Sequence, residues 1–311
     1  MNWIFLVVIA QFLNAFVALV DKHILTDSRK MPQPFVYAFY TCLISGGWVA
    51  VYLLRLIPLP FDHVGIPSFA NIVRPSLEVV ALSFLSAYTF FTALTAMFTS
   101  LQKHDASDVM PVIGAVSAIA AYGLGYFFLD AKLTPNFLIG VTLLAVGTAL
   151  VSRFRFTLST AMMAVYSGVF FAFHYVVLKG LFLVTSFDDG FFWSRIAFVF
   201  FALTLLMIPS YFERVRTQTK ETSGPAYALI LGSKILAGVA TLLILHATNQ
   251  GDVAVVQALG GLQYVFIIIF GIIMTLRPGS KVRVETYNYE HVLQKAFFVA
   301  IIALGFLVLF R

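Results

Sequence analysis

The stretch VAVVQALGGLQYVFIIIFGIIMTL, residues 253–276, runs for 24 residues without a charged side chain. The hydrocarbon core of a bilayer is about 30 Å thick, and a helix of about 20 apolar residues crosses it. Only helices and closed barrels satisfy their backbone hydrogen bonds in that environment. Because this run is so long and unbroken, it predicts a helix that spans a membrane.

Nine further runs of the same kind account, together with this one, for nearly all of the 311 residues. Clusters of proline and charge separate them. The segment from Leu56 to Asn71 is apolar, but three prolines interrupt it, so we expect an interfacial or lid-like loop there. The predicted spans are Trp3–Val20, Phe35–Leu54, Val79–Leu101, Val109–Leu129, Asn136–Ser152, Phe156–Leu178, Gly190–Met207, Tyr227–Leu245, Val253–Leu276 and Ala296–Phe310.

The composition excludes a soluble protein of ordinary surface polarity. Hydrophobic residues make up 60% of the chain, charged residues 11%, and the mean hydropathy is +0.94. The net charge of +6 comes from lysines and arginines beside the spans, which indicates contact with lipid headgroups and no nucleic-acid partner. Cys42 is the single cysteine, so an intramolecular disulfide is excluded. The run Trp3–Val20 lacks a basic start and a cleavage site, so we expect a retained helix there.

The second half of the chain repeats features of the first. Ala15-Phe16 followed by Lys22 aligns with Ala172-Phe173 followed by Lys179, and Asp108 aligns with Asp252. The approaches to these aspartates, residues 102–104 and 246–248, keep a constant offset of 144. We therefore expect two repeats, residues 1–152 and 153–311, with five spans each. Because five is odd, the repeats would face opposite sides of the membrane and enclose a central cavity. The expected fold class is an all-α integral membrane protein with ten transmembrane helices.

Three segments around the fourth and fifth spans resemble the EamA-type family of the drug/metabolite transporter superfamily: Ser107–Val112, Tyr126–Thr134 and Ile139–Gly147. Asp130 stands where members of that family usually carry glutamate, and Met274–Pro278 replaces the corresponding acidic turn in the second half. The resemblance implies ten helices, a central cavity and transport of a small solute, without naming the solute.

Three ionisable side chains lie within predicted spans, where a charge costs about 2.5–3.5 kcal/mol on insertion scales. Lys234 shares a helix face with Gly238 and Thr241, and either contacts an anionic group in the cavity or extends its stem towards the interface. Arg195 has the same two alternatives, and the resemblance also implies an arginine near its position. His174 either titrates during transport or remains a neutral imidazole bonded to a neighbouring helix.

Polar stripes supply the remaining candidate residues. Gln11 and Asn14 share one face of the first span, and Gln257 and Tyr264 share one face of the ninth. Such stripes either line a pathway or bond helices together. Tyr88 offers aromatic surface to a solute or to lipid. The two aspartates that open the fourth and ninth spans, Asp108 and Asp252, are expected to be helix caps.

We find no nucleotide-binding, hydrolase or metal-ligand motif, and therefore predict neither an enzyme nor a cofactor or metal. The favoured hypothesis is a secondary transporter, an exporter or exchanger of a small organic solute that works by alternating access; a homodimer is left open. A second hypothesis is a membrane enzyme acting on a lipid-linked or interfacial substrate between the loops Leu56–Pro75 and Arg277–Glu290, with Glu285 and His291 as acid and base. A third is a non-transporting assembly or sensor subunit with a solid interior.

Lysine and arginine counts address orientation in the plasma (cell inner) membrane. Loops after odd-numbered spans and their flanks hold 13 of these residues, whereas the other side holds 5. Because cytoplasmic loops carry the excess of positive charge, the count predicts that both termini lie outside the cytoplasm. The family resemblance implies the opposite, with both termini inside.

Overall fold

The computed structural model describes residues 2–27, 33–56, 66–130 and 157–276, together with 138–140, 142–143 and 146. These residues form helices and connecting segments without a β-strand. Seven helices are long and apolar enough to cross a membrane, and a bent helix pair brings the number to eight if it counts as one span. The prediction of an all-α multi-pass membrane protein is therefore confirmed. Most of the predicted fifth span, and the whole of the tenth span and of the loop Arg277–Glu290, lie outside the described residues.

The first four predicted spans are found, with ends shifted by up to six residues. Turn-forming or proline residues mark several helix starts; the side chain of Ser76, for example, accepts from the amide of Val79 at 3.2 Å. The elements are α1 (Asn2–Thr26), α2 (Pro34–Gly47), the 3-10 segment η1 (Trp48–Leu56), η3 (Phe69–Asn71), α3 (Leu77–Lys103) and α4 (Ala106–Leu129).

The second half follows the same order of long helices. Its elements are α6 (Leu158–Val184), α7 (Phe187–Leu205), α8 (Pro209–Glu221), α9 (Gly224–Gln250), α10 (Val253–Ala258), the 3-10 segment η4 (Leu259–Gly261) and α11 (Leu262–Leu276). Asp252 caps this last region as predicted, since its carboxylate accepts from the amide of Ala254 at 2.7 Å. Asp108 lies in the first turn of α4 rather than at the N-cap position, which Asp105 occupies because the helix begins earlier than expected.

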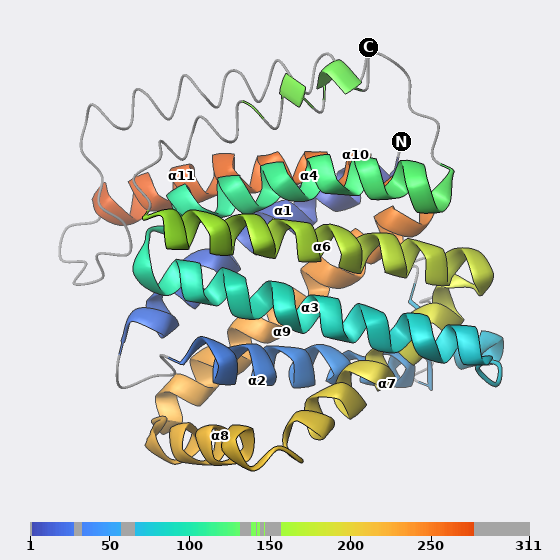
Figure 1. Ribbon diagram of the computed structural model, residues 1–311, viewed down its shortest axis with the longest axis horizontal. Coiled ribbons are helices and arrows are strands. Elements are labelled where there is room, and N and C mark those ends of the chain that lie inside the picture. The colour runs from blue at the N-terminus through green and yellow to red at the C-terminus, as the bar shows by residue number, and fades with distance from the viewer. Residues whose placement is uncertain are drawn as a thin grey trace.

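The segment between Pro209 and Pro225 is a helix rather than the simple break that its prolines and charges suggest. Pro209 occupies the first turn, where proline is tolerated because that amide has no intrahelical partner. The resulting helix α8 is bent by 99° from α7, so it runs across the direction of its neighbour (Figure 1). The ring of Tyr211 in α8 packs 4.6 Å from the ring of Phe35 in α2.

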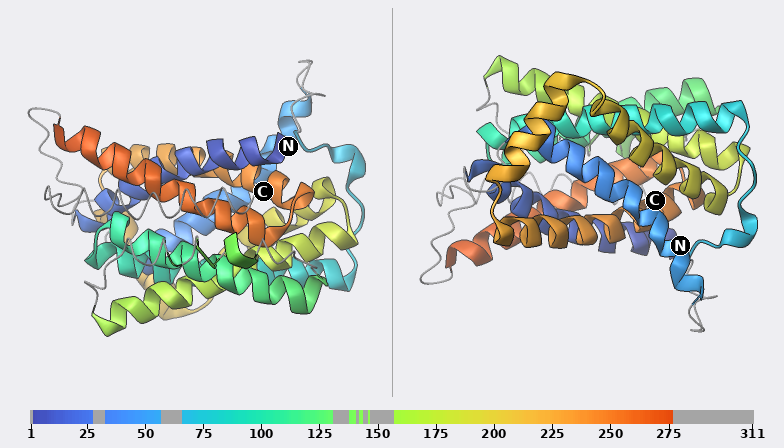
Figure 2. Two further views of the ribbon diagram at one scale, coloured as in Figure 1. Left: turned by 90° about the horizontal axis from the view of Figure 1, so that it is seen from above. Right: turned by 90° about the horizontal axis from the view of Figure 1, so that it is seen from below.

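The long helices form an elongated bundle, with α3, α6 and α4 running side by side (Figure 1). Helix α6 packs along α3 and α4, while α1 packs along α9 and α11. Small residues such as Ala15, Ala18 and Ala87 are buried in the main core and allow close helix approach. Figure 2 shows α1, from the start of the chain, lying beside α9 and α11, from its second half.

Candidate functional site

A cavity of about 170 Å³ lies at the centre of the bundle. This space could hold roughly ten water molecules, or a small solute. Side chains from α1, α2, α3, α4, α6, α9, α10 and α11, with one residue of η4, line it. Its position therefore depends on helices from both halves of the sequence.

The long helices that line the cavity contribute residues from one face each, as α9 and α1 show. In α9 the lining residues are Lys234, Ala237, Thr241 and Ile244, which recur at intervals of three and four residues. This spacing places side chains one above another on the same helix face. In α1 the stripe runs from Gln11 to Asp21, a distance of about 15 Å at 1.5 Å per residue. The cavity thus has two ends that differ chemically.

One end holds a buried ion pair between Asp21 of α1 and Lys234 of α9. The Lys234 ammonium lies 2.9 Å from each carboxylate oxygen, and the two side chains are only 4% and 3% exposed. Tyr37 donates to the same carboxylate at 2.6 Å and Ser233 at 3.2 Å. A buried charge is tolerated when it is paired and hydrogen-bonded, and both conditions are met here.

Aromatic rings complete the environment of the ammonium group. Its nitrogen lies 4.4 Å from the ring centre of Tyr37 and 5.1 Å from that of Phe98, within the range of cation–π attraction. Tyr37 belongs to α2 and Phe98 to α3. The ion pair therefore joins four helices, and it leaves the cavity wall at this end with no net charge.

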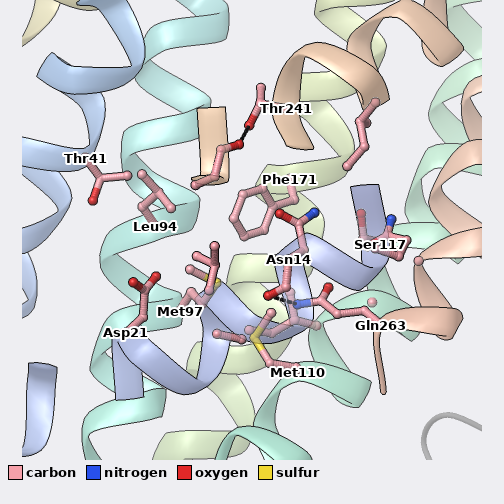
Figure 3. Close-up of a pocket in the computed structure, with 18 of the residues that line it drawn as sticks. Asn14, Asp21, Thr41, Leu94, Met97, Met110, Ser117, Phe171, Thr241 and Gln263 are labelled. Atoms are coloured by element: carbon pink, nitrogen blue, oxygen red, sulfur yellow. Dashed lines mark hydrogen bonds between the residues drawn. The ribbon is translucent and has the colours of Figure 1, made fainter. Parts of the chain in front are cut away.

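The other end is rich in carboxamides. Ser117 of α4 donates to Gln257 of α10 at 3.1 Å, and the side chain of Gln263 donates to the backbone carbonyl of Asn14 at 3.2 Å. The side-chain nitrogen of Gln11 lies beside Gly260. Figure 3 shows Asn14, Gln263 and Ser117 grouped on one side of the pocket, away from Asp21.

The helical region that carries Gln257 and Gln263 is interrupted beside the cavity. Between α10 and α11 the chain tightens into the 3-10 segment η4, which contains Gly260 and Gly261. Opposite this break, α4 contains Pro111 and Gly114, and a Cβ atom on Gly114 would overlap the hydroxyl of Tyr264. Irregular backbone at membrane depth is tolerated where it lines a cavity, and interrupted helices commonly mark binding sites in transporters.

Two lysines bind backbone carbonyls at the ends of α3 and α9, just before α4 and α10 begin. Lys22 of α1 donates at 2.8 Å to the carbonyls of Leu101 and His104 at the end of α3. Lys179 of α6 donates to the carbonyls of Thr248 at 2.9 Å and Gly251 at 3.1 Å, at the end of α9. Cations near the last carbonyls of a helix satisfy groups that lack intrahelical partners.

Five of the eight residues that the sequence analysis singles out line this cavity, and all five come from α1, α9, α10 or α11. They are Gln11, Asn14, Lys234, Gln257 and Tyr264. Arg195, His174 and Tyr88 are not among the described residues that line it. Tyr88 is 49% exposed on the outside of the bundle and contacts the rings of neighbouring phenylalanines.

Arg195 and His174 are buried behind the cavity wall, where the ring of Phe90, a lining residue, lies 4.9 Å from the ring of His174. The guanidinium carbon of Arg195 stacks over two rings of its own helix, Phe198 at 4.2 Å and Phe191 at 5.0 Å. One terminal nitrogen of this arginine has no hydrogen-bond partner among the described residues. His174 bonds to the carbonyl of Ser86 at 3.0 Å, which agrees with its interpretation as an imidazole bonded to a neighbouring helix.

Sequence reasoning missed Asp21, the partner of Lys234. Asp21 directly follows the predicted span Trp3–Val20, a position that indicates a loop residue. In the structure α1 continues to Thr26, and both charged residues lie inside the helix and are buried. The repeat offers a signal that could have revealed this, because Lys179, which aligns with Lys22, is followed by a further apolar stretch.

The fold and the cavity together define a multi-pass α-helical membrane protein with a polar site at its centre. No family model and no curated protein matches the sequence. A solved structure described only as "Crystal structure of protein" has a similar fold, with a TM-score of 0.66 and 15% sequence identity. The likeness covers 99% of this chain and 96% of that chain, and at this identity it concerns the fold alone.

Proposed function

We propose that this protein is a secondary transporter of a small organic solute, built from two inverted repeats that open the cavity to each side of the membrane in turn. The observation that carries the proposal is the central cavity, because its wall combines an ion pair, carboxamides and apolar side chains from both predicted repeats. Small-solute sites have this mixture of apolar surface and a few convergent polar groups.

Pairs of equivalent contacts support the repeat. Lys22 and Lys179 align in sequence, and each caps the helix two spans further along its own half. The acceptors His104 and Thr248 are separated by the same offset of 144 that relates Asp108 to Asp252. The packing of α1 on α9 likewise has its counterpart in the packing of α6 on α3. Two bundles related in this way can rock around a shared site.

Access from the two sides of the membrane tests the proposal. Asn14→Cys, in a background where the buried Cys42 is replaced by alanine, would be treated with a membrane-impermeant methanethiosulfonate in right-side-out and inside-out vesicles. We expect labelling from both sides, because the cavity should alternate between them. Ala10→Cys is the matched control on the same helix; Ala10 is fully buried and does not line the cavity, so it should react from neither side.

Labelling of Asn14→Cys from one side only would favour the interfacial enzyme, and its protection from both sides would favour the non-transporting subunit. Orientation is a separate proposal: on the charge count, the termini lie outside the cytoplasm of the plasma membrane. A C-terminal reporter that is active only in the cytoplasm would contradict it. A thermal-shift screen of small metabolites would then identify stabilising solutes.

A further inference from the structure

The charge balance and the hydrogen-bonding groups of the cavity restrict the solute that it accepts. This inference rests on the proposed transport function and deepens it. We infer that the solute is uncharged, with an amide-like edge that binds the carboxamide end and an apolar or aromatic body that lies along the cavity wall.

The first argument is electrostatic. Among the described residues that line the cavity, Asp21 and Lys234 are the only ones with charged side chains. Both oxygens of Asp21 already accept from Lys234, and one also accepts from Tyr37 and Ser233. A solute ion entering this cavity would leave water without gaining a free counter-charge. An uncharged solute has no such desolvation cost.

The second argument concerns hydrogen bonding. The side-chain amides of Gln11 and Asn14 line the cavity and have no side-chain hydrogen bond among the described residues. Gln257 accepts from Ser117 through its oxygen and keeps its amide nitrogen as a donor. Each carboxamide offers donors and an acceptor side by side, which matches a group that itself has both. An amide or lactam edge meets this requirement, whereas a carboxylate offers only acceptors and an ammonium only donors.

The third argument concerns the rest of the wall. Between the carboxamides and the ion pair, the lining is largely apolar, and it includes Leu94, Met97, Met110, Ile113 and Phe171. Figure 3 shows Phe171 and Met97 between the two polar groups. Such a surface favours a flat or aliphatic body, because its burial removes apolar area from water on both partners.

Three probes with the same ring and different charges test the inference: benzamide, benzoate and benzylammonium. Binding to the purified protein in detergent would be measured by isothermal titration calorimetry. We expect the dissociation constant of benzamide to be at least tenfold lower than that of either ion. An ion that binds as tightly as benzamide would overturn the inference, as would tighter binding of zwitterionic phenylalanine or no benzamide binding at all.

Variants at each end of the cavity separate the two arguments. Lys234→Met leaves the carboxylate of Asp21 without its counter-ion, and the preference should shift towards benzylammonium by at least tenfold; Asp21→Asn should shift it towards benzoate. Gln11→Leu should weaken benzamide binding about tenfold, whereas Gln250→Leu, at the exposed end of α9, should leave it unchanged. Unchanged preferences in all three cavity variants would overturn the inference. If a charge variant does not fold, the comparison of benzamide with benzoate and benzylammonium on the wild-type protein still tests whether the solute is uncharged.

The outcome is distinguishable from failure of the transport proposal. One-sided labelling of Asn14→Cys together with a benzamide preference would reject transport and keep the ligand class. Two-sided labelling together with a preference for an ion would keep transport and reject the ligand class.

Discussion

The buried pair of Asp21 and Lys234 makes a quantitative prediction about stability. Removing one partner of a buried ion pair typically costs about 3–5 kcal/mol, because the other charge remains in a poorly solvated place. In Lys234→Met the carboxylate keeps its bonds from Tyr37 and Ser233, so we expect the lower end of the range, about 3 kcal/mol. In Asp21→Asn the ammonium keeps the rings of Tyr37 and Phe98, each worth about 0.5–2 kcal/mol, so we expect a similar loss.

The double variant Asp21→Asn/Lys234→Met should be more stable than either single variant. Asparagine can still accept from Tyr37 and Ser233, and methionine fills most of the volume of the lysine stem without a charge. We expect a loss of about 1 kcal/mol, because neutral replacement of a buried pair is often tolerated. The coupling energy would then be about 5 kcal/mol, which is the sum of the two single losses, about 6 kcal/mol, minus the loss in the double variant.

The assay is reversible unfolding of the four proteins in mixed detergent micelles, followed by helical circular dichroism. The order of stability is the decisive readout: wild type, then the double variant, then both single variants. A double variant that loses the full sum of about 6 kcal/mol would refute the reasoning, because the two side chains would then contribute independently. Single variants as stable as the wild type would show that water already solvates the pair.

Two further predictions concern helix contacts and can be checked by thermal unfolding. Gly238→Ala should destabilise the protein by about 1–3 kcal/mol, since a Cβ atom there would overlap the indole of Trp48, whereas Gly232→Ala on the same helix faces open space and should change stability by less than about 1 kcal/mol; equal effects would contradict the close contact. Lys22→Met should cost more than Lys179→Met, although Lys179 donates to the carbonyls of Thr248, Asn249 and Gly251 and Lys22 to only two carbonyls. The reason is burial: Lys22 is only 8% exposed whereas Lys179 is half-buried, and a charge-assisted bond, worth about 1.5–3 kcal/mol, is stronger away from water. The reverse order would show that burial does not set these contributions.

Much of the fold could be predicted from the sequence because each membrane-spanning helix is recognisable from its own apolar run, without reference to distant residues. The run from Val253 to Leu276 is predicted to be helical because its backbone groups find few other partners in lipid, although the structure interrupts it with η4 beside the cavity. The stripe of Gln11 and Asn14 could also be recognised, because helical spacing alone puts them on one face. The offset of 144 between the halves recurs in the structure, where His104 and Thr248 accept from Lys22 and Lys179.

Helix ends and charge partners were harder to predict, since they depend on residues distant in the chain. Asp21 follows an apolar run and therefore looked like part of a loop, yet Lys234, 213 residues later, makes its burial possible. The proline and charges near Pro209 suggested a break, and packing instead accommodates a helix that lies across its neighbour.

By itself, the sequence determined that this protein is a bundle of membrane-spanning helices and which faces of those helices are polar. The free energy of transferring a segment into lipid depends on the residues of that segment alone. Only the tertiary structure decided that Lys234 is neutralised, that Arg195 and His174 are not among the described residues that line the central cavity, and that carboxamides from α1, α10 and α11 meet across it. These results depend on which helices pack together, because the contacts involved join residues distant in sequence and form only in the folded bundle.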